Sequence, residues 1–101
     1  MSDFMIIGEL YFVKELFWFL FPTKELAAAG RTWARPSRCS AANIAKVLSE
    51  RYNCNVAVVE ENTYVVFLEM DEDYSKVLDS NGNIGWIRCW SFYSYFELVK
   101  E

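Results

Sequence analysis

The chain has 101 residues, of which 53% are hydrophobic and 18% aromatic, and its formal net charge is −4. This composition excludes an intrinsically disordered chain, because disordered segments are poor in apolar and aromatic residues. The length predicts a single domain over residues 1–101 with one core. Each aromatic ring buries about 150–250 Å², and together the rings exceed what one small core encloses. We therefore expect some rings at an interface, and a homo-oligomer.

The charge is unevenly distributed along the chain. Segment 24–51 carries six basic and two acidic residues, a net charge of +4, whereas the remainder carries four basic and twelve acidic residues, a net charge of −8. An acidic protein with one basic segment can bind an anionic partner locally, although its overall field repels nucleic acid. Self-association between unlike faces is an equally simple interpretation.

The three cysteines, Cys39, Cys54 and Cys89, form no C-x-x-C pair, and the chain has no histidine. A zinc site of the common ligand sets is therefore not expected, and no pattern indicates a cofactor. Free, buried thiols are typical of a reducing compartment, so we expect a cytoplasmic protein. The apolar run 16–21 is far shorter than the roughly 20 residues of a membrane-spanning helix, and the N-terminus lacks the basic region of a secretory signal.

The first part of the chain favours two strands. Segment 4–13 has strand propensity, with Gly8 at a bend or bulge. The aromatic run 16–21 fits a strand covered on both faces, with a hydrophobic helical turn as the alternative. Pro22 speaks against the helix, because it disfavours the helical conformation at Phe21.

The next segment predicts a short helical turn and then a loop. Residues 26–29 can form one turn of helix that ends at Gly30. Residues 31–36 look extended, and we expect a long, mobile or partner-facing loop within segment 23–36.

A longer helix is predicted from Ser37 or Ser40 to about Tyr52, because either serine can cap it. Asn53 is a reasonable terminator. Apolar residues at three- and four-residue spacing form one stripe on this helix: Ala41, Ile44, Val47, Leu48 and Tyr52.

Two hairpins are expected after the helix. In the first, strands 55–59 and 63–69 flank a turn at Asn62, a residue type that tolerates positive φ. The acidic connection 70–73 follows.

The second hairpin carries the strongest turn signal of the chain. Strands 76–78 and 83–88 flank Asn81-Gly82, and Asn-Gly between apolar strands is typical of a tight hairpin turn.

The end of the chain resembles SH3-like barrels over residues 63–99. The strand that contains Gly85-Trp86-Ile87 follows a hairpin, and a short turn leads to the closing strand 95–99. The resemblance implies a mainly β fold, a small SH3-like barrel with one inserted helix. Strand 8–13 would be its first strand and pair with the closing strand, and a loop–helix insertion would occupy about 23–53.

The resemblance does not extend to ligand recognition. Signalling SH3 domains have an Ala-Leu-Tyr-Asp-Tyr-like opening and a Trp-Trp pair, and this chain has neither. Polyproline binding is therefore not implied. The whole is similar to short, stand-alone SH3-like proteins of bacterial or phage type.

Catalysis finds little support in the sequence. Without histidine the usual Ser–His and Cys–His dyads cannot form, so we do not expect an enzyme. The acidic residues Glu69, Asp71, Glu72 and Asp73 lack the glycine and distal glutamate of an EF-hand loop, and a solvated loop is the preferred interpretation.

The leading hypothesis is a non-enzymatic interaction module that acts through protein–protein contact or self-association. Its expected partner-binding residues are Arg31, Trp33, Arg35, Arg38, Trp90 and Tyr93. The alternative is single-stranded nucleic-acid binding through segment 31–38, since arginines beside an aromatic ring can hold phosphates and stack a base. In the simplest structural interpretation these arginines only pair with acidic residues, including those of a neighbouring subunit.

Overall fold

The computed structural model describes residues 7–35, 40–88 and 95–99. The chain is mainly β, as expected. Its elements are β1 (Leu10–Val13), β2 (Phe17–Leu20), α1 (Lys24–Ala29), β3 (Trp33–Ala34), α2 (Ala41–Tyr52), β4 (Ala57–Val59), β5 (Tyr64–Asp71), β6 (Tyr74–Asp79), β7 (Ile84–Arg88) and β8 (Phe96–Leu98). The short α1 falls where the helical turn was predicted.

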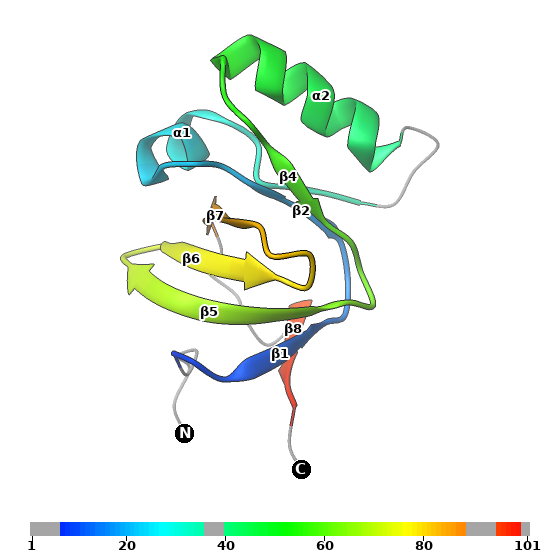
Figure 1. The fold of residues 1–101 in the computed structure, drawn as a ribbon, viewed down its shortest axis with the longest axis vertical. Helices are drawn as coiled ribbons and strands as arrows, with labels where there is room; N and C mark the ends of the chain where they lie inside the picture. The colour runs from blue at the N-terminus through cyan, green and yellow to red at the C-terminus, as the bar shows by residue number, and fades with distance from the viewer. Residues whose placement is uncertain (1–6, 36–39, 89–94, 100–101) are drawn as a thin grey trace.

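The strands form two antiparallel sheets, with α2 packed against β4 of the smaller one and α1 against β7 of the larger one (Figure 1). The larger sheet has the order β7-β6-β5-β1-β8, and the smaller has the order β3-β2-β4. A bridge between Phe21 and Trp86 connects the end of β2 to β7. In the described part of the chain no pairing joins the outer strands β7 and β8, so a closed barrel is not shown.

One long-range expectation and one local expectation are confirmed. The first strand pairs with the closing strand, with Tyr11 opposite Leu98 and Val13 opposite Phe96. Strands β6 and β7 form the predicted hairpin, and Gly82 has the positive φ of 86° that its turn requires. Glycine adopts this conformation without steric cost.

The first predicted hairpin is wrong. Strand β4 pairs with β2 in the small sheet, whereas β5 pairs with β1 and β6 in the large one. Asn62 has the expected positive φ of 65°, but the backbone N–H of Asn62 donates to Val13 O at 2.7 Å, and Val13 N–H donates to Thr63 O at 2.8 Å. The connection therefore fastens to β1 and carries the chain from one sheet to the other.

A hairpin turn replaces the predicted acidic connection at 70–73. Strand β5 continues to Asp71 and β6 begins at Tyr74, so only Glu72 and Asp73 separate them. Glu72 has a φ of 57°. The strand is longer than expected because it is regular beyond a bulge after Phe67.

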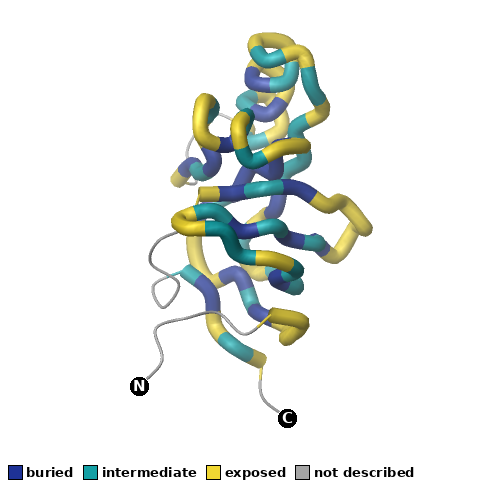
Figure 2. The backbone as a smooth tube through the Cα atoms, turned by 90° about the vertical axis from the view of Figure 1, so that its left-hand side faces the viewer, coloured by how far each residue is buried: buried dark blue, intermediate teal, exposed yellow. Residues whose placement is uncertain are grey.

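Strand β2 contributes to both hydrophobic cores, which explains its continuous aromatic run. Trp18 and Leu20 pack in the core between the sheets. Phe19, and Phe21 just after the strand, point to the other side, into the core beneath the helices, which we call the second core. Along β6 and β7, in contrast, buried residues alternate with less buried ones (Figure 2), as expected for strands with one inner face.

Helix α2 begins after Ser40 and ends at Asn53, which has a left-handed conformation with φ of 51°. Its buried residues are Ala45 and Leu48. The predicted stripe is wrong at Val47, which is 54% exposed. The stripe was too wide, because only the side of α2 that faces the second core is covered.

Candidate binding groove

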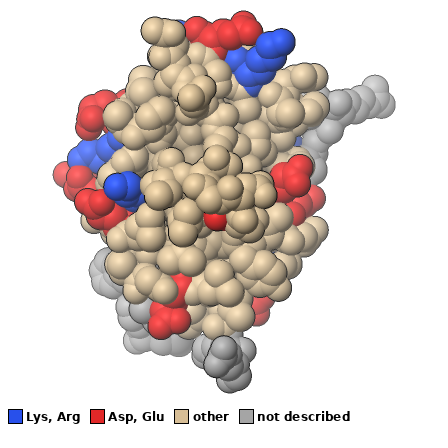
Figure 3. Space-filling view, viewed as in Figure 1, with Lys and Arg blue, Asp and Glu red and all other residues tan. Residues whose placement is uncertain are grey.

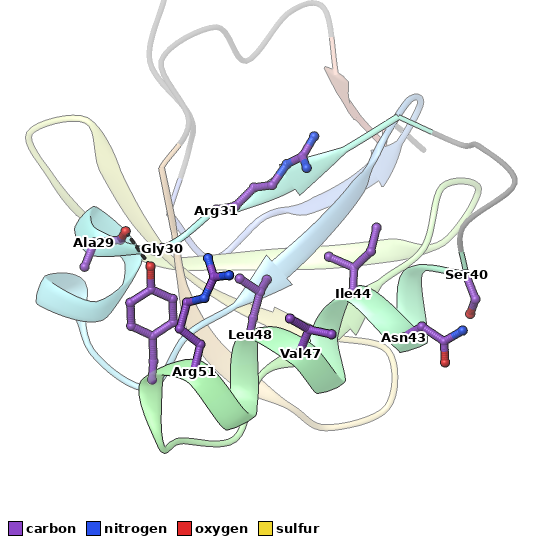
Figure 4. Close-up of a pocket in the computed structure, with 10 residues that line it drawn as sticks. Ala29, Gly30, Arg31, Ser40, Asn43, Ile44, Val47, Leu48 and Arg51 are labelled. Atoms are coloured by element: carbon purple, nitrogen blue, oxygen red, sulfur yellow. Dashed lines mark hydrogen bonds between the residues drawn. The ribbon is translucent and has the colours of Figure 1, made fainter.

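A groove with a volume of about 820 Å³ runs along α2 beside the segment that connects α1 to β3 (Figure 4). We call it the α2 groove. It is lined by Ala29, Gly30, Arg31, Ser40, Asn43, Ile44, Val47, Leu48, Arg51 and Tyr52. A space of this size is within the range of sites that hold small ligands or short peptide segments.

The walls of the α2 groove are joined at one end. The Tyr52 hydroxyl donates a hydrogen bond to Ala29 O at 3.0 Å, and the Tyr52 ring packs against the buried Phe21 with centroids 6.1 Å apart. Gly30 lies so close to Phe21 that an added Cβ would come within 2.5 Å of the ring. These contacts place the end of α2 against the α1–β3 connection.

The floor of the α2 groove is apolar. Ile44, Val47 and Leu48 lie side by side on the helix face that Figure 4 shows. Val47 is one of the most exposed large apolar side chains of the described residues. An aliphatic group of a ligand could cover it and gain roughly 25 cal/mol for each Å² of apolar surface that leaves water.

The charged residues of the α2 groove are both arginines. Arg51 is in the last turn of α2 and its side chain extends from the helix toward the opposite wall (Figure 4). Arg31 stands on that wall, where its Nε donates to Trp33 O at 3.0 Å and its guanidinium carbon lies 5.9 Å from the centroid of the Trp33 ring. Neither arginine has an ion pair with another residue of the described segments.

The structure brings together only part of the predicted partner-binding set. Arg31 and Trp33 are in contact, and Arg35 is exposed just after β3. Trp33 itself is half-buried against the core between the sheets, opposite Trp18. Arg38, Trp90 and Tyr93 lie outside the described residues.

Of the residues that line the α2 groove, only Arg31 belongs to the partner-binding set predicted from the sequence; Val47 and Arg51, among others, were missed. Their spacing held a usable signal, because residues four apart on a helix are neighbours on its surface. Ile44 and Leu48 lie on the same face by the same rule. No local signal indicated that residues 29–31 would form the opposite wall.

The other residues that the sequence singled out, Cys54 and Asp71, make packing and ion-pair contacts within the fold. Cys54 is half-buried and packs against the second core. Asp71, at the end of β5, pairs with Lys24 of α1, and this hydrogen bond raises the pKa of Lys24 above its ordinary value of 10.5. Among residues 7–35, 40–88 and 95–99 no group of three or more acidic or cysteine side chains could hold a metal ion.

Comparison of the chain with protein-family models, curated proteins and solved structures gave no match. Neither helix in the described segments is long and apolar enough to cross a membrane.

Proposed function

We propose that the chain is a small, non-enzymatic binding module that holds an acidic, aliphatic segment of a protein partner in the α2 groove. The observation that carries the proposal is the combination of an apolar floor with two arginines and no acidic residue in one groove. In a chain of net charge −4, such a groove is electrostatically distinct from its surroundings.

An SH3-like barrel is the fold that we propose for this module. Strands β5, β6 and β7 form a three-stranded meander, and β8 lies beside β1, which lies beside β5. This order supports the resemblance of segment 63–99 to SH3-like barrels. The bridge from Phe21 to Trp86 supports it further, because it extends the large sheet toward β2.

The lining of the α2 groove specifies the chemistry of its occupant. The guanidinium of Arg51 can bind a carboxylate with two parallel hydrogen bonds. Leu or Ile side chains of the occupant would cover Val47 and Ile44. Arg31 on the opposite wall would attract a second carboxylate, so an occupant with alternating acidic and aliphatic residues fits best.

The surroundings of Trp33 favour a protein partner over single-stranded nucleic acid. Base stacking needs an open aromatic face, whereas Trp33 is half-buried and Arg31 lies over its ring. The groove also contains few of the cationic groups that phosphate backbones require. Single-stranded nucleic acid is therefore the less favoured ligand, and a binding experiment with both ligands distinguishes them.

The direct test is fluorescence anisotropy with a labelled peptide of alternating Glu and Leu. A peptide with Lys in place of Glu is the charge-reversed control. A labelled single-stranded oligonucleotide represents the alternative ligand, nucleic acid. We expect the acidic peptide alone to bind, more weakly as salt is added, because ion pairs at an exposed groove are screened. Binding of the oligonucleotide alone would replace this proposal with the nucleic-acid function.

Matched charge variants locate the site. Arg51→Glu should weaken acidic-peptide binding roughly tenfold or more, which corresponds to about 1.4 kcal/mol. Lys46→Glu makes the same charge change on α2 outside the groove and should leave the affinity nearly unchanged. Equal losses in the two variants would show a non-specific charge effect and contradict the assignment of the α2 groove.

A further inference from the structure

An apolar row crosses the outer face of the large sheet. The pairing register places Leu10 opposite Val66, Val66 opposite Leu78, and Leu78 opposite Ile84. The backbone bond from Val99 N–H to Leu10 O at 3.0 Å extends the row to the last described residue. This set spans the whole width of the sheet, and we call it the outer row: Val99, Leu10, Val66, Leu78 and Ile84.

These side chains share one face because directly opposed residues of antiparallel strands point to the same side. The opposite side of the same strands holds the buried Val65, Val77 and Gly85. The outer row is much less buried: Leu10 is 40% exposed and Ile84 is 54% exposed. Phe12 and Tyr64 lie beside the row as a ring pair with centroids 5.3 Å apart.

Such a face is unusual for a sheet that is open to solvent. Antiparallel sheets with one wet face normally alternate apolar and polar residues, yet every member of the outer row is apolar. The nearest charges on this face lie in the two adjoining rows: the exposed Glu97 is opposite Phe12 on one side, and Lys76 and Glu69 pair with each other at 3.9 Å on the other. Figure 3 shows charged side chains mainly at the margins of the viewed face, around a largely uncharged centre over β5 and β6.

We propose that the outer row is a self-association surface that packs against the same row of a second copy of this chain. A twofold interface places a patch on its own counterpart, and an uncharged row meets itself without opposing like charges. Together with Phe12 and Tyr64, two copies would bury on the order of 1,000 Å², the lower limit of a specific interface. A weak dimer follows, formed at high protein concentration.

The salt response separates this surface from the α2 groove. Each copy has a net charge of −4, so two copies repel one another, and added salt screens that repulsion. Dimerisation should therefore strengthen with salt, whereas binding of an acidic peptide to the α2 groove should weaken. One chain thus has two surfaces with opposite salt dependence.

Sedimentation equilibrium over a wide concentration range tests the proposal. Wild type should show a reversible monomer–dimer equilibrium. Ile84→Glu and, as a second variant, Leu10→Glu should each weaken it at least tenfold, because each would bury a charge against an apolar surface. Val47→Glu is the matched control, since Val47 is also 54% exposed but lies on α2, and it should dimerise as wild type does.

Circular dichroism melts establish that each variant is folded before it is compared. A wild type that stays monomeric into the millimolar range would overturn the proposal. So would a dimer that tolerates both Ile84→Glu and Leu10→Glu, or one that Val47→Glu disperses as strongly as they do.

Discussion

The backbones of Phe21 and Trp86 are hydrogen-bonded to each other in both directions. Phe21 N–H donates to Trp86 O at 3.1 Å, and Trp86 N–H donates to Phe21 O at 2.7 Å. This reciprocal pair connects β7 to the end of β2, the central strand of the small sheet. Phe21 is fully buried, and the half-buried Trp86 packs in the same core beneath the helices. The position of the α2 groove therefore depends on this contact, because Phe21 also supports Tyr52 and Gly30.

The first prediction concerns Gly85, next to this bridge. An added Cβ would lie 2.6 Å from Leu20 Cβ and 2.9 Å from Phe21 O, so the backbones would have to separate. Gly85→Ala should lower the free energy of unfolding by about 1–3 kcal/mol, the usual cost of overpacking. Urea unfolding followed by tryptophan fluorescence measures it.

Gly82 provides the control for this substitution. It has a φ of 86° but no atom within 4 Å of an added Cβ. Gly82→Asn should change stability by less than about 1 kcal/mol, because Asn tolerates the left-handed conformation. If Gly85→Ala were as harmless, the close approach of β2 and β7 would be contradicted.

Elements with local signals could be predicted from the sequence. Asn81-Gly82 indicated the β6–β7 hairpin, and Asn53 indicated the end of α2, because each acts within a few residues of its own position. The pairing of the first and closing strands followed from the SH3-like resemblance rather than from any local pattern. Neither prediction depended on knowing how the chain divides into two hydrophobic cores.

The partner of β4 could not be predicted in the same way. Sequence proximity favoured pairing of 55–59 with 63–69, but β2 is an aromatic strand that needs neighbours on both edges, and it takes β4 as one of them. Similarly, the exposure of Val47 depends on where α2 rests on the second core, which its own periodicity does not fix. The α2 groove depends on both of these long-range contacts.

A second prediction concerns Asp79, which organises the β6–β7 turn. Its carboxylate accepts hydrogen bonds from the backbone N–H of Asn81 and of Asn83 at 2.9 and 2.8 Å, and from Asn83 Nδ2 at 3.0 Å. Asp79→Ala leaves two backbone donors without their acceptor and should cost on the order of 2 kcal/mol. Thermal unfolding measures it, with the exposed turn variant Asp73→Ala as the near-neutral control; equal midpoints would contradict the role of Asp79.

A third prediction is that Ser75→Ala leaves stability unchanged or raises it. Ser75 is fully buried, and its hydroxyl has no hydrogen-bond partner among the described residues. An unpaired buried hydroxyl is unfavourable, so its removal relieves that cost. Differential scanning calorimetry should show a melting temperature at or above that of wild type.

Ser49→Ala is the matched control for Ser75. The Ser49 hydroxyl donates to Ala45 O at 2.8 Å and accepts from Val56 N–H at 3.0 Å. Its loss should destabilise the protein by about 1–2 kcal/mol. A marked loss of stability in Ser75→Ala would mean that its hydroxyl has a partner in the folded protein.

A fourth prediction concerns the pH dependence of the Lys24–Asp71 pair, which joins α1 to the β5–β6 hairpin. The hydrogen bond to Asp71 raises the pKa of Lys24 above its unfolded value of 10.5. The stabilisation is therefore fully present below pH 10.5 and is lost as the pH rises through the raised folded-state pKa. Wild type should melt slightly above Lys24→Met near neutral pH, and the difference should vanish in strong alkali. A difference that persists there, or that salt does not reduce, would show that the pair acts through packing instead.

The last prediction connects the fold to the α2 groove through Tyr52. Tyr52→Phe keeps the ring contact with Phe21 but removes the hydrogen bond to Ala29 O, so the two walls lose their direct connection. The expected cost is about 1 kcal/mol of stability. Binding of the acidic peptide should also weaken, because the wall formed by residues 29–31 would be less rigid and would have to be ordered when the peptide binds. Tyr64→Phe removes the hydroxyl of an exposed tyrosine on the large sheet and should alter neither quantity. If Tyr52→Phe loses stability but keeps the wild-type affinity, the hydrogen bond holds the fold without shaping the groove, and the peptide must bind through α2 alone.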